Sequence, residues 1–355
     1  MTAPAQPVRL LILGTGGMAN THATEFATIP GVTLVAGIDT RPGQLAAFCD
    51  RHSIENRFAT VAEALAWGGF DAVTNVTPDA AHYDTTMPFL AAGKHVLCEK
   101  PLATNTAHAT EMAAAAAAAG VVNMINLSYR NVAAMQTAAR LVLAGDIGTV
   151  RHFEASYLQS WLTQPAWGEW STEPQWLWRL STAHGSKGVL GDVGIHILDF
   201  ATFVAGLSAV EVSCRLVTFH KAPDDAIGEY VLDANDSATM QIVLENGALG
   251  TVSATRFASG HLNDLRLRIY GDKGGLEVGY ENNISRLRAC IGDDRLTATW
   301  AEVAAEKLPS VYERFITAIR GEGVAVPDFA RGAALQGLLD RAEESAAQGG
   351  LSLLV

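Results

Sequence analysis

Two short stretches of the sequence carry side chains that could move a proton. Residues 98 to 101 read Cys-Glu-Lys-Pro directly after an apolar run, so that Lys100 stands where a buried strand is expected to end. Residues 191 to 200 read GDVGIHILDF, in which Asp192 and His196 are four positions apart and would share one face of a helix. A lysine, and a histidine supported by a carboxylate, are typical of general acid–base chemistry near neutral pH.

The residue after Lys100 restricts the direction of its side chain. Pro101 has a fixed φ and favours an extended conformation at the residue before it. A lysine desolvated there, beside a cationic ring, would have a lowered pKa and could share the proton of a hydroxyl group. The alternative is a surface pair of Glu99 and Lys100 that only ends a strand.

The Asp192 stretch also allows two other interpretations. Asp192 could lie near the N-cap of a helix, with His196 packed inside the protein. Asp192, His196 and Asp199 could instead form a carboxylate-rich metal site. We disfavour the metal site and expect no metal.

A glycine-rich turn follows the first expected strand. Residues 14 to 19 read GTGGMA, a G-x-G-x-x-A pattern that suits a tight turn, close approach to a pyrophosphate and packing of the following helix on the sheet. Asp39 follows at the distance where a carboxylate accepts the ribose hydroxyls of NAD. NADP is disfavoured, although Arg41 stands two residues away and could reach a 2′-phosphate. Asp39 could otherwise be an ordinary N-cap.

The expected cofactor and substrate contacts extend over both halves of the chain. Thr77 and Pro78 follow another apolar run at the same edge of the predicted sheet. The expected cofactor contacts are Gly14, Thr15, Gly16, Gly17, Met18, Asp39, Thr40, Thr77, Pro78, Glu99 and Lys100. Residues 157 to 180 hold five of the seven tryptophans, and aromatic faces suit a polyol ring. The expected substrate contacts are Lys100, Asn126, Tyr129, Gln159, Trp167, Arg179, Asp192 and His196.

The elements that must position these residues change in character near residue 126. Before it, short apolar runs at 8–13, 32–38, 71–76, 95–99 and 121–126 alternate with helix-length segments, which predicts a doubly wound parallel sheet. After it, long strand-like runs at 150–159, 209–219, 237–257, 265–271 and 274–280 predict a large, open, mainly antiparallel sheet. Helices are expected near 189–205, 309–320 and 329–347.

We therefore expect an α/β protein of two domains. Residues 1–126 would form a Rossmann domain that binds NAD, and residues 127–355 an α+β domain for substrate binding and oligomerisation. The C-terminal helix could pack back on the first domain. One face of the second sheet must be covered, which predicts a homodimer or homotetramer.

Composition excludes several classes of partner. The 355 residues carry a formal charge of −12, which disfavours nucleic acids and anionic membrane surfaces. Four scattered cysteines give no disulfide framework or thiolate metal site. The N-terminus has no signal-peptide pattern, and residues 1 to 7 are expected to form a loose tail. We expect a cytoplasmic protein.

Taken together, the stretches CEKP, GTGGMA and GDVGIHILDF resemble the family of glucose-fructose oxidoreductase, inositol dehydrogenase and MocA (GFO/IDH/MocA) over essentially the whole chain. The resemblance implies that Lys100, Asp192 and His196 form the catalytic set and that no metal takes part. It also implies a Rossmann domain followed by an open-faced antiparallel α/β domain.

The function expected from the residues and the resemblance is an NAD-dependent dehydrogenase. It would oxidise a secondary hydroxyl of a sugar, anhydrosugar or inositol to the ketone by hydride transfer. Three alternatives remain open: an NAD-using glycoside hydrolase of the same family, an oxidoreductase that holds its cofactor permanently, and a non-catalytic NAD-binding sensor.

Overall fold

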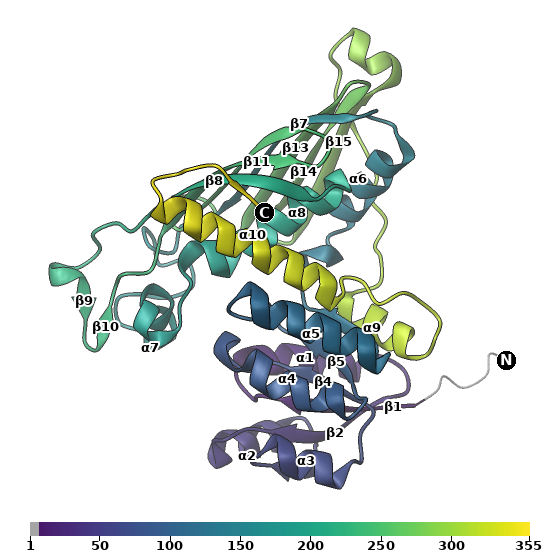
Figure 1. The fold of residues 1–355 in the computed structure, drawn as a ribbon, viewed down its shortest axis with the longest axis vertical. Helices are drawn as coiled ribbons and strands as arrows, with labels where there is room; N and C mark the ends of the chain where they lie inside the picture. The colour runs from purple at the N-terminus through teal and green to yellow at the C-terminus, as the bar shows by residue number, and fades with distance from the viewer. Residues whose placement is uncertain (1–6) are drawn as a thin grey trace. The chain divides into compact units, whose positions relative to one another are not determined.

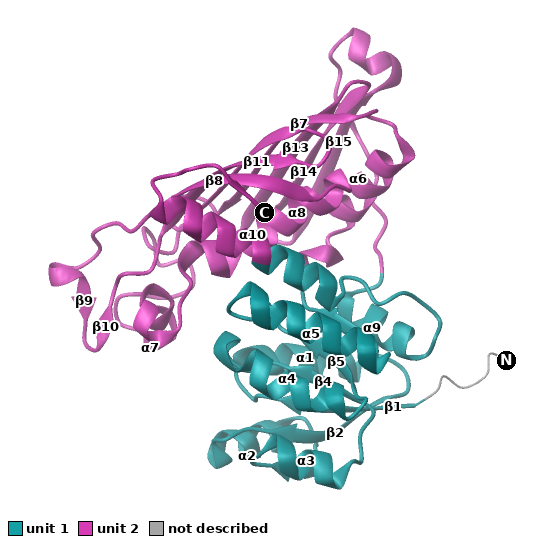
Figure 2. Ribbon diagram, viewed as in Figure 1, with its two compact units in different colours: residues 1–128, 309–336 teal, residues 129–308, 337–355 magenta. Residues whose placement is uncertain are grey.

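The computed structural model describes residues 7–355, so that most of the expected N-terminal tail lies outside the described residues. The chain divides into two compact units (Figure 2). The first ends at Ser128 and also includes Pro309–Gln336, and the second comprises Tyr129–Leu308 and Gly337–Val355. A division of the chain at residue 126 alone would place 309–336 in the second domain. Side-chain packing instead joins this late segment to the first unit.

The first unit is built on a six-stranded parallel sheet with the strand order β3-β2-β1-β4-β5-β6. The strands are β1 (Val8–Leu13), β2 (Val32–Ile38), β3 (Asn56–Phe58), β4 (Ala72–Asn75), β5 (His95–Cys98) and β6 (Asn123–Ile125). The apolar runs form strands because a sheet covered on both faces buries every side chain of its central strands. The order reverses between β1 and β4, where ligands bind in open α/β sheets.

Helices cover both faces of this sheet (Figure 1). On one face lie α1 (Gly17–Ala27), α2 (Pro42–Arg51) and α9 (Val311–Ile319). Helices α3 (Val61–Trp67), α4 (His82–Ala91) and α5 (Thr106–Ala119) contact one another in that order. Phe315 and Ile316 of α9 are buried against Phe26 of α1, which explains why 309–336 belongs to the first unit.

The second unit is built on a nine-stranded, mainly antiparallel sheet with the order β16-β15-β14-β13-β7-β12-β11-β8-β17. The strands are β7 (Val150–Leu158), β8 (Ala209–Val217), β11 (Ser237–Leu244), β12 (Leu249–Thr255), β13 (Asp264–Gly271), β14 (Gly274–Glu281), β15 (Ile284–Ile291), β16 (Ala301–Glu302) and β17 (Leu353–Leu354). The fold class expected from the sequence is therefore confirmed.

Helices α6 (Ala133–Ala144) and α8 (Ile195–Ala205) contact strands of this sheet. The chain ends with α10 (Phe329–Ala347), whose bounds match the expected helix. A short helix, α7 (Pro174–Leu177), and a two-stranded hairpin of β9 (Ala226–Ile227) and β10 (Tyr230–Val231) lie outside the large sheet. In the residues described, no helix is long and apolar enough to cross a membrane.

Six strands were not expected from the sequence: β3, β15 and the two-residue strands β9, β10, β16 and β17. β3 has only three residues, too few to show a period. β15 reads ISRLRACI, in which two arginines interrupt the apolar residues. In the structure the preceding Asn282 and Asn283 both have positive φ, which is typical of a tight hairpin turn. One pairing also differs from an antiparallel sheet, because β7 and β12 run parallel.

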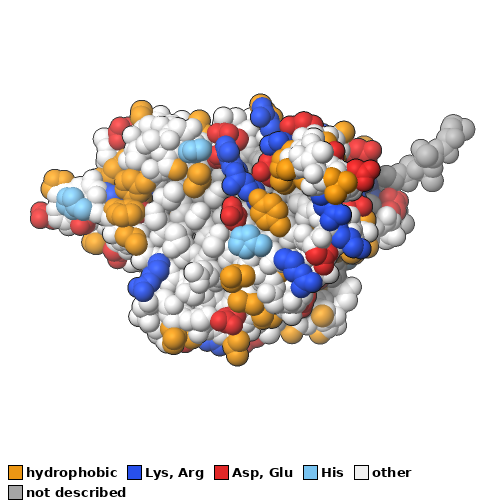
Figure 3. All heavy atoms as spheres, turned by 90° about the horizontal axis from the view of Figure 1, so that it is seen from above, with side chains coloured by type: hydrophobic (Ala, Val, Ile, Leu, Met, Phe, Trp, Pro, Cys, Tyr) orange, Lys and Arg blue, Asp and Glu red, His pale blue; other side chains and the backbone are white. Residues whose placement is uncertain are grey.

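The face of the large sheet that carries polar residues shows a row of alternating charge. Glu154, Arg268, Glu277, Arg288 and Glu302 stand opposite one another on neighbouring strands. The Arg288–Glu277 contact, at 3.0 Å, is the shortest ion pair along this charge row. The view in Figure 3 likewise shows acidic and basic side chains side by side rather than a patch of one sign.

Candidate functional site

The glycine-rich turn joins β1 to α1 in the first unit. Gly14 has a φ of +85°, and a Cβ there would lie 2.7 Å from the carbonyl oxygen of Val76, so that only glycine fits. Gly16 is the N-cap of α1 and has no side chain to bond the first N–H groups of the helix. A Cβ on Gly17 would meet no atom within 4 Å. The turn therefore presents backbone donors at a helix N-terminus with open space beside them, as a pyrophosphate requires.

Asp39, after β2, is bound to this turn. Its Oδ2 accepts hydrogen bonds from the Thr15 amide at 2.9 Å and the Thr15 hydroxyl at 2.7 Å. Arg41 donates from its Nε to Oδ1 at 3.0 Å and from its Nη2 to Oδ2 at 3.1 Å. Burial alone would raise the pKa of Asp39, but the Arg41 and Thr15 donors hold the pKa well below its usual range. The carboxylate is thus ionised and fixed beside the turn.

The remaining cofactor candidates follow successive parallel strands, and the carboxyl ends of such strands meet at one edge of a sheet. Thr77 and Pro78 come after β4; Thr77 is half-buried and Pro78 is exposed. The Thr77 hydroxyl donates to Asn75 Oδ1 at 2.7 Å, which fixes the turn. Met18 and Thr40 are exposed.

Glu99 lies in a buried polar network at the end of β5. Its Oε1 accepts from His22 Nε2 at 2.8 Å and from Asn126 Nδ2 at 2.6 Å, while its Oε2 accepts from the Lys100 amide at 3.1 Å. Burial alone would raise the pKa of Glu99, but His22, Asn126 and Lys100 lower it to about 2. The sequence reading missed His22, which is fully buried on α1. This network fixes the backbone from which the half-buried Lys100 projects.

His82 also fixes the loop after β5, which carries Lys100 and Pro101. Its Nδ1 lies 2.7 Å from the Pro101 carbonyl oxygen, and its Nε2 lies 3.0 Å from the Thr77 carbonyl oxygen. Two carbonyl acceptors require both ring nitrogens to donate, so that the imidazole is protonated. Burial alone would lower the pKa of His82, but Cys98, Asp79 and the Pro101 carbonyl raise it to about 10. A buried cation thus joins the turns after β4 and β5.

In the second unit, Asp192 and His196 lie in a continuous helical segment. Leu190–Gly194 forms a π-helical turn, and α8 continues from Ile195. A π-turn inside a helix is frequent at functional sites. Asp192 lies in the π-turn and keeps 32% of its side chain exposed, whereas His196 lies in the first turn of α8 and is buried.

A pair of tyrosines lies against both residues. The ring of Tyr129 meets that of His196 edge-on with centroids 4.9 Å apart, and the ring of Tyr157 lies 6.5 Å from it. Burial raises the pKa of Tyr129 to about 12 and raises that of Tyr157 well above its usual value, and the Asp192 charge adds to both shifts. Neither phenol is therefore a base at neutral pH, and the two tyrosines act as hydrogen-bond donors or acceptors.

The tyrosine pair is anchored by a turn that the sequence reading did not single out. Asn263 Oδ1 accepts from the Tyr157 hydroxyl at 2.9 Å and from Gln159 Nε2 at 2.7 Å. Tyr157 therefore donates to Asn263, and its oxygen accepts from the Tyr129 hydroxyl. Tyr129 and Gln159, both expected substrate contacts, thus belong to one network in the structure.

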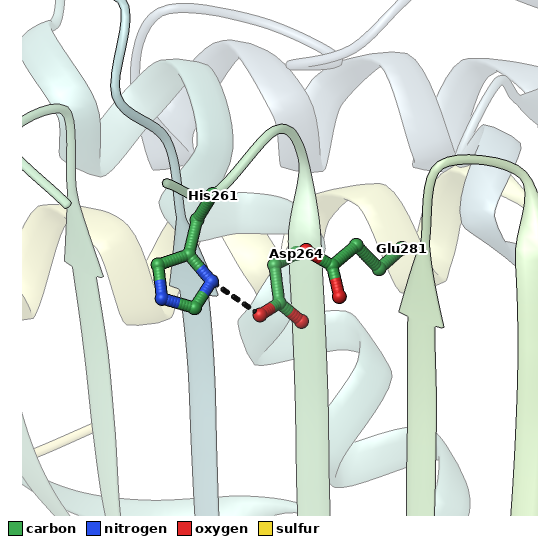
Figure 4. Close-up of side chains that lie close together, drawn as sticks. All are labelled: His261, Asp264 and Glu281. Atoms are coloured by element: carbon green, nitrogen blue, oxygen red, sulfur yellow. Dashed lines mark hydrogen bonds and ion pairs between the residues drawn. The ribbon is translucent and has the colours of Figure 1, made fainter. Parts of the chain in front are cut away.

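Next to Asn263, three side chains lie close enough to suggest a metal site (Figure 4): His261, Asp264 and Glu281. Asp264 accepts from His261 Nδ1 at 2.7 Å, but it also accepts from Arg266 Nε at 2.9 and 3.0 Å. The Arg266 guanidinium lies 3.6 Å from Glu281 as well. Because a cation already occupies the position between the carboxylates, we interpret this group as an ion-pair cluster that holds the turn at Asn263.

The tryptophan-rich segment forms a small core of its own. Trp161 packs with Leu162, Leu177 and Leu180, and Trp167, Trp170 and Trp176 cover this cluster. The guanidinium of Arg179 lies 4.5 Å from the ring of Trp178 and 5.4 Å from that of Trp176. Most of the indoles therefore contribute to packing, while Trp178 is 38% exposed.

Asp199 does not join Asp192 and His196 in a cluster of metal ligands. Both of its oxygens accept from Arg130, at 2.6 and 2.7 Å, and the pair is buried. The Arg130 guanidinium also lies 3.5 Å from the centre of the Phe203 ring. This bidentate pair ties the segment after β6 to α8.

Comparison with known proteins agrees with this arrangement. Residues 8–127 match the model described as the oxidoreductase family with an NAD-binding Rossmann fold, and residues 135–277 match the GFO/IDH/MocA C-terminal domain. The chain belongs to the GFO/IDH/MocA family. The resemblance seen in the sequence is thereby confirmed, and the first unit is an NAD-binding domain.

Relatives of this chain include proteins named as dehydrogenases of sugars and inositols. Levoglucosan dehydrogenase of Pseudarthrobacter phenanthrenivorans is 26% identical over 78% of this chain and 74% of that protein. D-glucoside 3-dehydrogenase of Escherichia coli is 27% identical over 97% of both chains. The crystal structure of an oxidoreductase domain protein from Kribbella flavida superposes with a TM-score of 0.86, at 29% identity and 99% coverage of both chains.

Proposed function

We propose that this GFO/IDH/MocA protein is an NAD-dependent dehydrogenase that oxidises a secondary hydroxyl of a sugar, anhydrosugar or inositol to the ketone. The observation that carries the proposal is the wall formed around His196 by Tyr129 and Tyr157, with Asp192 beside both tyrosines. Because both phenols stay protonated, the histidine is the group that can accept a proton near neutral pH. The named activities of the two relatives support a polyol as the substrate class.

In this proposal two residues act on the reacting oxygen and a third supports one of them. His196 accepts the hydroxyl proton, Lys100 hydrogen-bonds the same oxygen and stabilises its developing negative charge, and Asp192 orients and supports the imidazolium. NAD, held by the glycine-rich turn and Asp39, would supply the hydride acceptor, so that two electrons would leave the carbinol carbon as hydride while the hydroxyl proton passes to His196.

The cofactor contacts are proposed from the edge of the first sheet. The Gly14–Met18 turn would hold the pyrophosphate, and Asp39 with Thr40 would hold the adenosine ribose. Thr77, Pro78 and Lys100 would line the nicotinamide side. Glu99 would act mainly by fixing Lys100, because its oxygens already accept from His22, Asn126 and the Lys100 amide.

The substrate contacts are proposed from the second unit and from the end of β6. Tyr129 and Gln159 would offer polar edges, with Trp167 and Arg179 as further contacts. Asn126 has an Oδ1 that is buried without a hydrogen-bond partner among the described residues, which leaves an acceptor for a ligand donor. To the residues expected from the sequence we add Tyr157 and Asn263.

We also propose that the protein is a homodimer or homotetramer that buries the open face of the large sheet. The charge row is largely self-complementary, because a two-fold axis that offsets the two rows by one position can place two of the three glutamates of one copy opposite the two arginines of the other.

The decisive experiment measures reduction of NAD, and separately of NADP, by the purified protein against a panel of monosaccharides, anhydrosugars and inositols. We expect NAD reduction with one ring class, and a loss of at least about 100-fold in kcat for Lys100→Ala and His196→Ala with little change in NADH affinity. Near-wild-type turnover in both variants would exclude the assigned roles. Product formed without net cofactor reduction would indicate a hydrolase instead, and tight NADH binding without any turnover would indicate a sensor.

A further inference from the structure

We propose that Arg256 is a positioning residue for Asp192, an inference that rests on the proposed function. Arg256 Nη2 donates to Asp192 Oδ2 at 3.1 Å, and its Nη1 donates to the carbonyl oxygen of Arg179 at 3.1 Å. The carbon of the guanidinium lies 5.0 Å from the centre of the Trp161 ring. The Arg256 side chain is fully buried, whereas that of Asp192 is 32% exposed. The arginine therefore holds the carboxylate from its inner side.

The sequence places Arg256 at a position where a core residue is expected. Along β12 the buried residues alternate, with Gly250, Val252 and Ala254 facing inward. Arg256 continues this period of two just beyond the end of the strand. Its amide donates to the Asp236 carbonyl at 3.0 Å, which fixes the backbone. An arginine at the inward position of a strand is costly unless a carboxylate compensates its charge.

The charges around Arg256 point to Asp192 as that partner. Burial lowers the pKa of Arg256 from its usual range, Asp192 and Asp236 raise it, and Arg179 lowers it. Asp236, also buried, already pairs with Lys221 at 2.6 Å. Asp192 is thus the carboxylate that hydrogen-bonds the guanidinium directly, and a cation at this distance favours its ionised form.

This contact has a direct consequence for His196. An ionised, oriented Asp192 supports the imidazolium, whereas the positive charge of Arg256 opposes it. The balance sets the pH at which His196 becomes an effective base. The phenols of Tyr129 and Tyr157 also sense the Asp192 charge, and both stay neutral over the working range. Removing Arg256 takes away the opposing positive charge, so that we expect the pKa of Asp192 and that of His196 to rise, while the lost orientation of Asp192 should appear as a lower kcat.

The test compares Arg256→Met with Arg256→Lys. In the methionine variant we expect the acid limb of the pH profile of kcat/KM to move upward by about one pH unit or more, and kcat to fall at least about 10-fold. In the lysine variant the charge is kept but the planar fork is lost, so that the acid limb should stay near its wild-type position while kcat remains reduced. An unmoved acid limb in Arg256→Met would overturn the proposal.

Lys221→Met is the matched control. It removes another buried cation of the same unit, one that contacts Asp236 and the Phe219 carbonyl rather than Asp192. We expect it to lower the denaturant midpoint without moving the acid limb. If Arg256→Met does not fold, Arg256→Lys still decides the question, because an upward shift of its acid limb would contradict a role carried by charge.

A second measurement does not depend on turnover. The carboxyl ¹³C resonance of Asp192, assigned by its loss in Asp192→Asn, is titrated in the wild type and in Arg256→Met. We expect the midpoint to rise in the variant. If the wild type oxidises no polyol, the proposed function fails, but this titration still tests the contact between Arg256 and Asp192. If the titration midpoint of Asp192 is the same in the wild type and in Arg256→Met, the proposed role of Arg256 is contradicted whatever the protein oxidises.

Discussion

Asp39 is the residue on which the choice between NAD and NADP depends most directly. In the structure Arg41 is paired with it, and the Arg41 side chain is 65% exposed. In the proposed assignment the carboxylate would repel a 2′-phosphate and would also hold Arg41, a guanidinium that could otherwise neutralise such a group.

Asp39→Ser should therefore change cofactor preference in two ways. Removing the carboxylate eliminates the repulsion and releases Arg41 towards a 2′-phosphate. We expect the ratio of kcat/KM for NAD to that for NADP to fall by at least about 10-fold, measured with a saturating polyol substrate. In the double variant Asp39→Ser/Arg41→Ala, we expect kcat/KM for NADP to return towards its wild-type value while kcat/KM for NAD stays reduced. A ratio unchanged in the single variant would contradict the assignment.

At the scale of secondary-structure elements, the network at the end of β5 connects three parts of the first unit. His22 of α1 also lies 2.7 Å from the Thr74 hydroxyl of β4, and the Tyr312 hydroxyl of α9 accepts from Asn126 at 3.2 Å. Glu99 is the charged centre of this network. Its loss should affect both the stability of the unit and the position of Lys100.

Glu99→Gln tests the contribution to stability. Because the folded-state pKa of Glu99, about 2, lies below its ordinary value of 4.5, the carboxylate contributes its full stability above about pH 4.5 and loses it as the pH falls towards 2. The shift corresponds to about 3 kcal/mol. We expect the variant to be less stable than the wild type at pH 6, with the difference narrowing towards pH 2.

The measurement is the urea midpoint as a function of pH, and Glu55→Gln is the control because Glu55 is exposed. A difference between wild type and Glu99→Gln that stays constant from pH 6 to pH 2 would show that the charge of Glu99 does not contribute.

At the scale of the whole molecule, the open face of the large sheet is the feature that predicts assembly. Arg268→Glu reverses one of the two positive charges of the charge row and leaves the new carboxylate between Glu154 and Glu277. We expect light scattering to report a dimer or tetramer for the wild type and a smaller species for the variant. Arg151→Glu, which reverses an exposed charge paired with Asp272 outside the charge row, is the control. A monomeric wild type would exclude the proposed interface.

The sequence by itself determined the class of fold and most of the elements. Apolar runs and glycine-rich turns are local signals, so that β1, β2, α5 and α10 could be located from their own residues. The motifs around Gly14, Lys100 and His196 likewise carry their spacing within a few residues. The same reasoning did not predict β3 and β15. β3 is too short to show a period, and two arginines interrupt the apolar residues of β15.

Only the tertiary structure decided which distant residues meet. His22 and Glu99 are 77 positions apart, and Tyr157 and Asn263 are 106 apart. Arg256 and Asp192 are separated by 64 residues, and nothing in the local pattern of either one names the other. Buried polar groups must find partners, but the partner is selected by how strands and helices pack. For this reason the candidate catalytic residues could be read from motifs, whereas the residues that orient them could not.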